Sequence, residues 1–209
     1  MNDHRPGRGN PTREQNPAYG LLQPVLTDMT NSEDQVRICV DDQQLWCLGD
    51  VRLKNLLVDL SPEARGVLTD LLSDYRKAKE SLAAAVAGVD AASVCRDCGG
   101  QCCENGKYRM NVFDALARIG ANTPTSAVFS QKPICPYGTE TGCTMESGLR
   151  PADCVLFICD AIDRKLSPQA RSVLATQEQR LRECIRKASG VTGERLATPL
   201  LIWAENGRK

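Results

Sequence analysis

The sequence predicts a mainly α-helical protein with a short N-terminal β-hairpin and an irregular, cysteine-rich metal-binding segment. A Leu-Ser-Pro opening followed by apolar residues at helical spacing begins at residue 60 and returns at residue 166, which predicts two long helices. Between them, eight of the chain's 11 cysteines lie from Cys95 to Cys159, separated by Gly and Pro. The two helices are therefore expected to flank a segment whose structure depends on its thiols.

The domain organisation follows from these patterns. Residues 1–33 are expected to be a flexible leader, because four prolines lie among Gly, Asn and charged residues with no apolar period. Residues 34–209 are expected to form a single domain. Its helical scaffold, residues 61–87 and 168–188, surrounds the cysteine-cluster segment 95–159.

Composition narrows the classes of partner and the compartment. Lys and Arg total 26 and so do Asp and Glu, so no global field favours nucleic acid or an anionic membrane surface. The apolar stretches are shorter than a bilayer requires and the N-terminus has no apolar targeting region. A cytoplasmic protein is expected, without nucleic-acid or membrane partners, and the identity of any protein partner stays open. The reducing cytoplasm and the odd number of cysteines argue against disulfides as the role of the cluster.

The hairpin is predicted from alternation near the N-terminus. Val36, Ile38 and Val40 alternate with polar residues, residues 41–43 can form a turn, and the apolar residues 45–48 follow. This pattern is typical of two short antiparallel strands.

The helix predicted over 61–87 has clear start signals. Ser61 can cap the free amides, Pro62 fits the first helical position and Glu63 faces the positive end of the helix dipole. One face should be buried, and a charged face should be solvated. The expected buried residues are Leu68, Leu71, Leu72, Tyr75, Leu82 and Val86. The charged residues placed mostly outside this stripe are Arg76, Lys77, Lys79 and Glu80.

Three further elements are predicted after the first long helix. Asn111 can cap a helix over 112–119 that Gly120 stops, and the second long helix should end at Gly190. The apolar run 198–204 predicts a short helix packed on the core. Residues 121–144 are expected to form a loop, which is unusually long for a domain unless its cysteines pin it.

The eight clustered cysteines predict a thiolate-rich metal site. Cys95 and Cys98 have the Cys-x-x-Cys spacing that lets two sulfurs share one ion, and a Gly-Gly turn follows them. Cys102 and Cys103 are adjacent and point to opposite sides of an extended chain, so one of them can join the first pair while the other serves a second site or packs. Either one site or two is compatible with eight thiols.

The ligand type limits the metal. Soft thiolates select zinc, copper(I) or an iron–sulfur centre and argue against magnesium or calcium. His4, the one histidine of the chain, lies in the leader and is a poor ligand candidate. Three other cysteines, Cys39, Cys47 and Cys184, lie within apolar patterns and are expected to be small buried residues rather than ligands.

The order of these parts resembles a known family. Cys95-x2-Cys98-x3-Cys102-Cys103 is followed by Cys135, Cys143, Leu-Arg-Pro-x2-Cys154 and Cys159, and this order is similar to the YkgJ-type cysteine-cluster family of proposed zinc- or iron-chelating domains. The family's pattern has two residues, not three, before the Cys-Cys pair, which leaves open which of that pair is a ligand. The resemblance implies these metal ligands: Cys95, Cys98, Cys102, Cys103, Cys135, Cys143, Cys154 and Cys159.

Arg150 lies within this motif. Its guanidinium could offset thiolate charge at the bound cofactor, and Pro151 fits the first turn of a helix that would carry Cys154 and Cys159. An ordinary surface arginine before a helix is the alternative.

Three classes of function remain open from the sequence. The favoured one is a metal-binding protein that holds zinc or an iron–sulfur centre without catalysis. The alternative is an iron–sulfur redox protein or enzyme, because the family resemblance extends to flagellin lysine methylases; the chain, however, has no paired carboxylates and no nucleotide-type glycine loop. In the third, the metal only holds the flanking helices, and the surface of 61–87 or 168–188 binds a protein.

Overall fold

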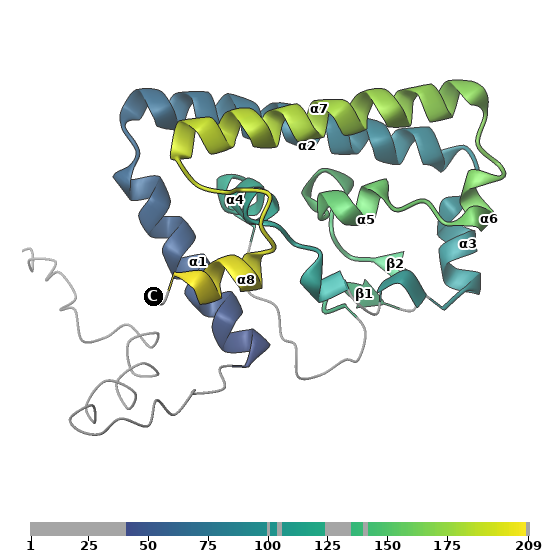
Figure 1. Cartoon of the computed structure of the whole chain (residues 1–209). Coiled ribbons are helices and arrows are strands. Elements are labelled where there is room, and N and C mark those ends of the chain that lie inside the picture. The colour runs from purple at the N-terminus through teal and green to yellow at the C-terminus, as the bar shows by residue number, and fades with distance from the viewer. Residues whose placement is uncertain (1–40, 100, 104–105, 124–134, 140–141, 208–209) are drawn as a thin grey trace, which may run out of the picture. The chain divides into compact units, whose positions relative to one another are not determined.

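A computed structural model describes residues 41–99, 101–103, 106–123, 135–139 and 142–207 (Figure 1). They belong to the unit that spans residues 40–209, and most of them are helical. The α-helices are α1 (Asp42–Asp59), α2 (Pro62–Ala87), α3 (Ala91–Asp97), α4 (Val112–Gly120), α5 (Ala152–Leu156), α6 (Asp160–Asp163), α7 (Pro168–Thr192) and α8 (Leu200–Asn206). The shorter elements are the 3₁₀ turns η3 (Gln101–Cys103), η4 (Gly106–Tyr108) and η5 (Ser147–Leu149) and the strands β1 (Gly138–Thr139) and β2 (Gly142–Cys143). None of the described helices has the length and apolar character needed to span a membrane.

The predicted N-terminal β-hairpin is wrong. Residues 45–48, expected to be its second strand, lie within α1, and residues 36–40 and the leader 1–33 lie outside the described residues. Asp41 caps α1 by accepting a hydrogen bond from the Gln44 amide at 2.8 Å, so the Asp-Asp pair starts a helix instead of a turn. Trp46 and Leu53 are buried seven residues apart, which is helical spacing.

The two long predicted helices form the scaffold, and α2 and α7 lie side by side with opposite directions (Figure 1). Ser61 and Ser167 cap them alike: each Oγ accepts from the amide three residues on, at 3.2 and 3.1 Å. The predicted end of α7 at Gly190 is two residues early. The helix continues to Thr192, and Gly193 ends it in the left-handed conformation at φ 72°.

Helix α4 lies in the core between the scaffold and the chain's last elements. The predicted Asn111 cap is confirmed, and it forms a capping box with Asp114. The free amides of Val112 and Phe113 donate to the carbonyls of Thr198 and Leu196 at 3.0 and 3.1 Å, so the segment before α8 completes the start of α4.

The described core joins α1, α2, α4, α7 and α8. The Tyr75 and Phe113 rings meet edge to face with centroids 4.7 Å apart. Trp203 of α8 is buried as expected, its indole N–H donates to Glu194 at 2.8 Å, and the Arg52 guanidinium of α1 stacks 3.8 Å from its ring. A cation–π contact between Arg52 and Trp203 therefore holds α8 against α1 in addition to apolar packing.

Lys79 is the exception to the predicted charge pattern of α2. It was expected to be mostly outside the buried stripe, yet both it and Asp114 have 0% side-chain exposure, and they form an ion pair at 3.0 Å. Lys79 Nζ also donates to the Arg150 carbonyl at 2.8 Å. The Asp114 carboxylate accepts from the Tyr75 hydroxyl at 2.9 Å and from the Ala152 amide at 3.2 Å. Burial lowers the pKa of Lys79, and Asp114 opposes that shift.

We predict that Lys79→Met lowers the free energy of unfolding by about 3–5 kcal/mol, because removing one partner leaves a buried charge uncompensated. Urea unfolding followed by circular dichroism measures the change. Lys77→Met is the matched control, since Lys77 is exposed two residues earlier on α2, and it should change stability by less than about 0.5 kcal/mol. Equal stability of the two variants would contradict a structural role for the buried pair.

Candidate metal centre

Four labelled elements that carry predicted ligands, α3, β2, α5 and α6, lie toward the same end of the α2–α7 pair (Figure 1). Five separate pieces of chain supply the eight predicted ligands. Cys95 lies in α3 and Cys98 caps it, Cys102 and Cys103 lie in η3, Cys135 and Cys143 lie before β1 and in β2, Cys154 lies in α5, and Cys159 caps α6.

The described thiols do not form a closed metal site as they are placed. Each of the ten described cysteines is a free thiol. Among the described residues, no three Cys, His, Asp or Glu side chains stand close enough to hold a metal ion as they are placed. The residues fit a metal by their chemistry, because every candidate donor is a soft sulfur.

The ionisation of Cys95 depends on burial and on neighbouring thiols. The Cys98 thiol donates to the Cys95 carbonyl at 3.3 Å, and Gly99 then turns the chain away from α3 with φ 63°. Burial raises the pKa of Cys95, and the thiols of Cys102, Cys98 and Cys159 raise it further by like-charge repulsion. Helix α3 packs against α6, which explains why Cys159 reaches this group from the far end of the segment.

Cys103 and Cys135 are joined through the backbone. The Cys135 amide donates to the Cys103 carbonyl at 3.0 Å, and the Gly138 amide donates to the Cys135 carbonyl at 2.8 Å. Gly138 pairs with Cys143 across the small hairpin. Burial, together with the neighbouring thiols of Cys102, Cys135 and Cys143, raises the pKa of Cys103 to about 12. Burial also raises the pKa of Cys135, while backbone hydrogen bonds from Tyr137 and Gly138 oppose that shift.

Cys154 is the most buried of these thiols in its electrostatic surroundings. Burial, together with the charges of Cys135, Asp114 and Cys143, raises the pKa of Cys154 to about 12. Its position is fixed by the buried network, because the Ala152 amide at the start of α5 donates to Asp114. The same helix was predicted to carry Cys159, but α5 ends at Leu156, and Cys159 instead begins α6.

Two arginines oppose the raised pKa values of the thiols. Arg150, the residue expected to offset thiolate charge, opposes the raised pKa of Cys95, and its Nε donates to the Met145 carbonyl at 3.0 Å. Arg109 lowers the pKa of both Cys135 and Cys154, and it stacks 5.0 Å from the Phe157 ring. Sequence reasoning did not assign Arg109 this role. Its place after the Cys-Cys pair was the only signal, and this signal is equally compatible with a strand.

The cysteines outside the cluster differ from each other. Cys184 is buried in α7 as predicted, whereas Cys47 is exposed on α1, so its expected burial is wrong. Cys39 lies outside the described residues. The short hydrophobic pattern around Cys47 lies on a helix, where the neighbouring Trp46 takes the buried position.

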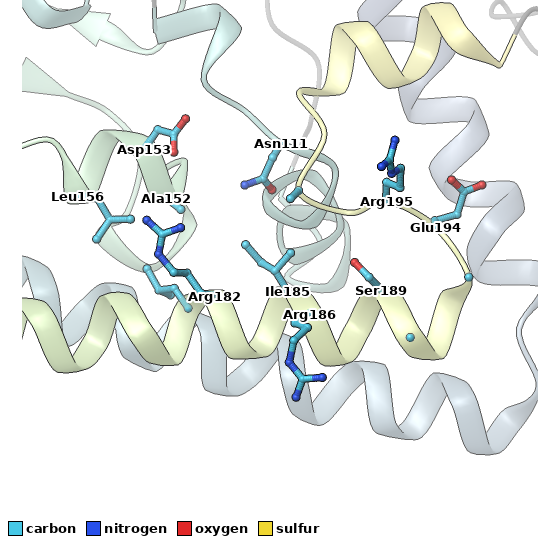
Figure 2. A pocket seen from close by; sticks show the side chains of 14 residues that line it. Asn111, Ala152, Asp153, Leu156, Arg182, Ile185, Arg186, Ser189, Glu194 and Arg195 are labelled. Atoms are coloured by element: carbon cyan, nitrogen blue, oxygen red, sulfur yellow. The ribbon is translucent and has the colours of Figure 1, made fainter.

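A groove of about 780 Å³ lies between α5, α7 and residues 193–197, and no cysteine lines it (Figure 2). Figure 2 shows Arg182 reaching from α7 toward α5, while Arg186 points away. Arg182, Arg186 and Glu194 already have ionic partners: Glu178 at 2.6 Å, Glu183 at 2.8 Å and Arg52 at 3.2 Å. These pairings give the groove no marked affinity for one class of ligand.

Comparison with known proteins finds no matching family model, no similar curated protein and no similar solved structure. The YkgJ-type resemblance therefore stays a prediction that rests on the cysteine motif.

Gly106 is required by its contact with Cys135. A Cβ at Gly106 would lie 2.6 Å from the Cys135 Cβ and 2.8 Å from its Sγ. We predict that Gly106→Ala displaces Cys135 and lowers the free energy of unfolding by about 1–3 kcal/mol. Thermal unfolding measures stability, and alkylation followed by peptide mass spectrometry measures the exposure of the Cys135 thiol, which should react faster.

The matched control is Gly66→Ala, because a Cβ at Gly66 on α2 meets nothing within 4 Å. Helix propensity should make this variant more stable by about 0.5–1 kcal/mol, with unchanged thiol reactivity. An unaltered Cys135 reaction rate in Gly106→Ala would show that the contact does not position the thiol.

Proposed function

We propose that this protein is a thiolate metal-binding protein that holds zinc or an iron–sulfur centre and uses the metal to order residues 95–159. The observation that supports it is that the elements carrying Cys95, Cys143, Cys154 and Cys159 lie toward the same end of the scaffold (Figure 1), where α3 packs against both α6 and β2. Isolated structural cysteines would be scattered through the core, as Cys184 is.

The weak packing of this end supports the same proposal. Helix α3 has no buried residue, and β1 and β2 have two residues each. By contrast, α2 buries six residues along its length. Ordering the backbone of a segment requires about 1–2 kcal/mol per residue, which so little apolar burial does not offset. Bound metal would supply the missing free energy, on the order of 10 kcal/mol for a structural zinc site.

The chain's residues would act on the metal in distinct ways. The cysteines would bind it as thiolates, Arg150 and Arg109 would reduce the net negative charge, and the backbone bonds around Cys135 would orient that ligand. When bound, zinc supplies structural cross-linking, and an iron–sulfur centre adds electron transfer.

Metal analysis of the full chain, purified without oxygen and with a thiol reductant, tests the proposal. We expect either zinc in a colourless protein, or iron and sulfide in a brown protein that absorbs in the visible. Cys184→Ala should keep the full metal content, because this buried thiol lies on α7 outside the cluster. A wild-type protein with neither metal, even after anaerobic reconstitution, would refute the proposed function.

Metal removal should loosen one end of the molecule. After chelation under reducing conditions, we expect faster hydrogen exchange in residues 91–99 and 143–144, because none of these residues is buried. The paired helices α2 and α7 should keep most of their protection, since they are packed along their length. Exchange measured by mass spectrometry on metal-loaded and stripped protein provides the comparison, and identical exchange at both ends would argue against an ordering role.

A further inference from the structure

One carboxylate in the first turn of α1 holds the short turn η4. The Oδ2 atom of Asp42 accepts hydrogen bonds from Lys107 Nζ at 2.7 Å and from the Tyr108 hydroxyl at 2.9 Å. The Lys107 ammonium also lies 4.7 Å from the centroid of the Tyr108 ring. These three side chains therefore join two parts of the chain that are 65 and 66 residues apart in the sequence.

The Asp42–Lys107 ion pair is partly shielded from water. The exposed fractions of the two side chains are 33% and 27%. The hydrogen bond from Lys107 holds the pKa of Asp42 below its usual value, so the carboxylate is charged at neutral pH. A pair in such surroundings contributes to structure and still responds to salt.

Helix α1 is a firm support for this contact. Trp46 and Leu53 on α1 are buried, and α1 packs against α8 and α4. Arg52 adds a hydrogen bond to the Trp203 carbonyl at 2.6 Å. The position of Asp42 is therefore set by the core and does not depend on the cysteine segment.

The other side of η4 lies against a predicted metal ligand. Gly106, the first residue of η4, is buried, and a Cβ placed on it would lie 2.6 Å from the Cys135 Cβ and 2.8 Å from its Sγ. The backbone of η4 therefore packs directly on the Cys135 side chain. The Arg109 amide donates to the Gly106 carbonyl at 3.2 Å, so the whole turn moves with Gly106.

The chain on either side of η4 is held as well. After the turn, Met110 is buried and its carbonyl accepts from the Leu200 amide at 2.8 Å. Before it, the Cys103 carbonyl accepts from the Cys135 amide at 3.0 Å. Asp42 acts between these two points, where it fixes the distance of η4 from α1.

We infer that Asp42 is a remote positioning residue for the Cys135 thiolate: through Lys107 and Tyr108 it holds η4 in place, and η4 determines where Cys135 lies. The inference rests on the proposed function and adds to it a residue outside the cysteine segment. The alternative is that the contact only stabilises the start of α1. In that case, loss of the contact lowers stability and leaves Cys135 unchanged.

Thiol reactivity tests the positioning without any metal. In the reduced, metal-free full chain, Asp42→Ala should increase the rate of Cys135 alkylation by about 2- to 5-fold, the range expected for loss of a partly shielded ion pair. Mass spectrometry of fragmented peptides separates Cys135 from Cys143. Asp59→Ala is the matched control, because it removes the same charge from the exposed last residue of α1 and should leave the rate unchanged.

Two further measurements distinguish positioning from general loosening. Tyr108→Phe removes one hydrogen bond, keeps the ring and should give a smaller increase in the same direction, so it carries the test if Asp42→Ala does not fold. Raising the salt concentration from about 0.05 to about 1 M should bring the wild-type Cys135 rate toward that of Asp42→Ala, because salt screens the pair. The rate in Asp42→Ala itself should change little.

Zinc competition against a chelator tests the effect on the proposed site. Asp42→Ala and Lys107→Met should each weaken zinc binding by about 2- to 5-fold. The double variant should lose less than the product of the two single effects, because both changes break the same contact. Fully multiplicative losses would show that the two residues act separately and would overturn the inference.

The outcomes separate this inference from the proposed function. Equal Cys135 reactivity in Asp42→Ala and Asp59→Ala, or equal zinc affinity in these two variants, would overturn the positioning role and leave thiolate metal binding intact. A wild type that binds no metal would overturn the proposed function and the role of Cys135 as a ligand. The alkylation rates would still show whether Asp42 controls the position of this thiol.

Discussion

The buried carboxylate of Asp114 fixes the relation between the core and the thiols. It is fully enclosed and accepts hydrogen bonds from Tyr75 and Lys79 of α2 and from the Ala152 amide at the start of α5. Lys79 extends the network to the Arg150 carbonyl. Cys154 lies two residues after Ala152. The buried Lys79–Asp114 pair therefore helps to fix the position of Cys154 in α5. A buried pair contributes little net stability compared with apolar packing, but it imposes a specific arrangement that apolar residues would leave freer.

The helical scaffold and the cysteine-carrying elements differ in how they are stabilised. The scaffold of α2, α4 and α7 is stabilised by apolar burial, whereas α3, which carries Cys95, has no buried residue and β2, which carries Cys143, has only two residues. The anchored ends of the cysteine segment restrict where its thiols can lie. A ligand that binds there completes an arrangement which the protein has already limited, so less ordering free energy is lost on binding.

Local signals in the sequence predicted part of this structure well. Ser61, Ser167 and Asn111 are capping residues whose role depends only on their neighbours, so the three helices they begin could be assigned from sequence. The hairpin was wrong because alternation over a few residues is also compatible with one buried face of a helix, and Trp46 and Leu53 form that face. Lys79 resembled a solvated residue until its partner, 35 positions away, was known. The candidate ligands could be named from their spacing, but the packing of α3 against α6 and β2 could not, because no local pattern encodes it.

The pairing of α1 with α8 has a consequence for synthesis on the ribosome. Arg52 of α1 binds the carbonyl of Trp203 and the carboxylate of Glu194, and residues 196 and 198 supply the acceptors for the first amides of α4. A growing chain whose clustered cysteines have just emerged still lacks these partners, because residues 194–203 follow Cys159 in the sequence. The clustered thiols therefore emerge from the exit tunnel before the core that positions them can close. A nascent chain in this interval depends on the reducing capacity of its surroundings to keep neighbouring thiols from oxidising.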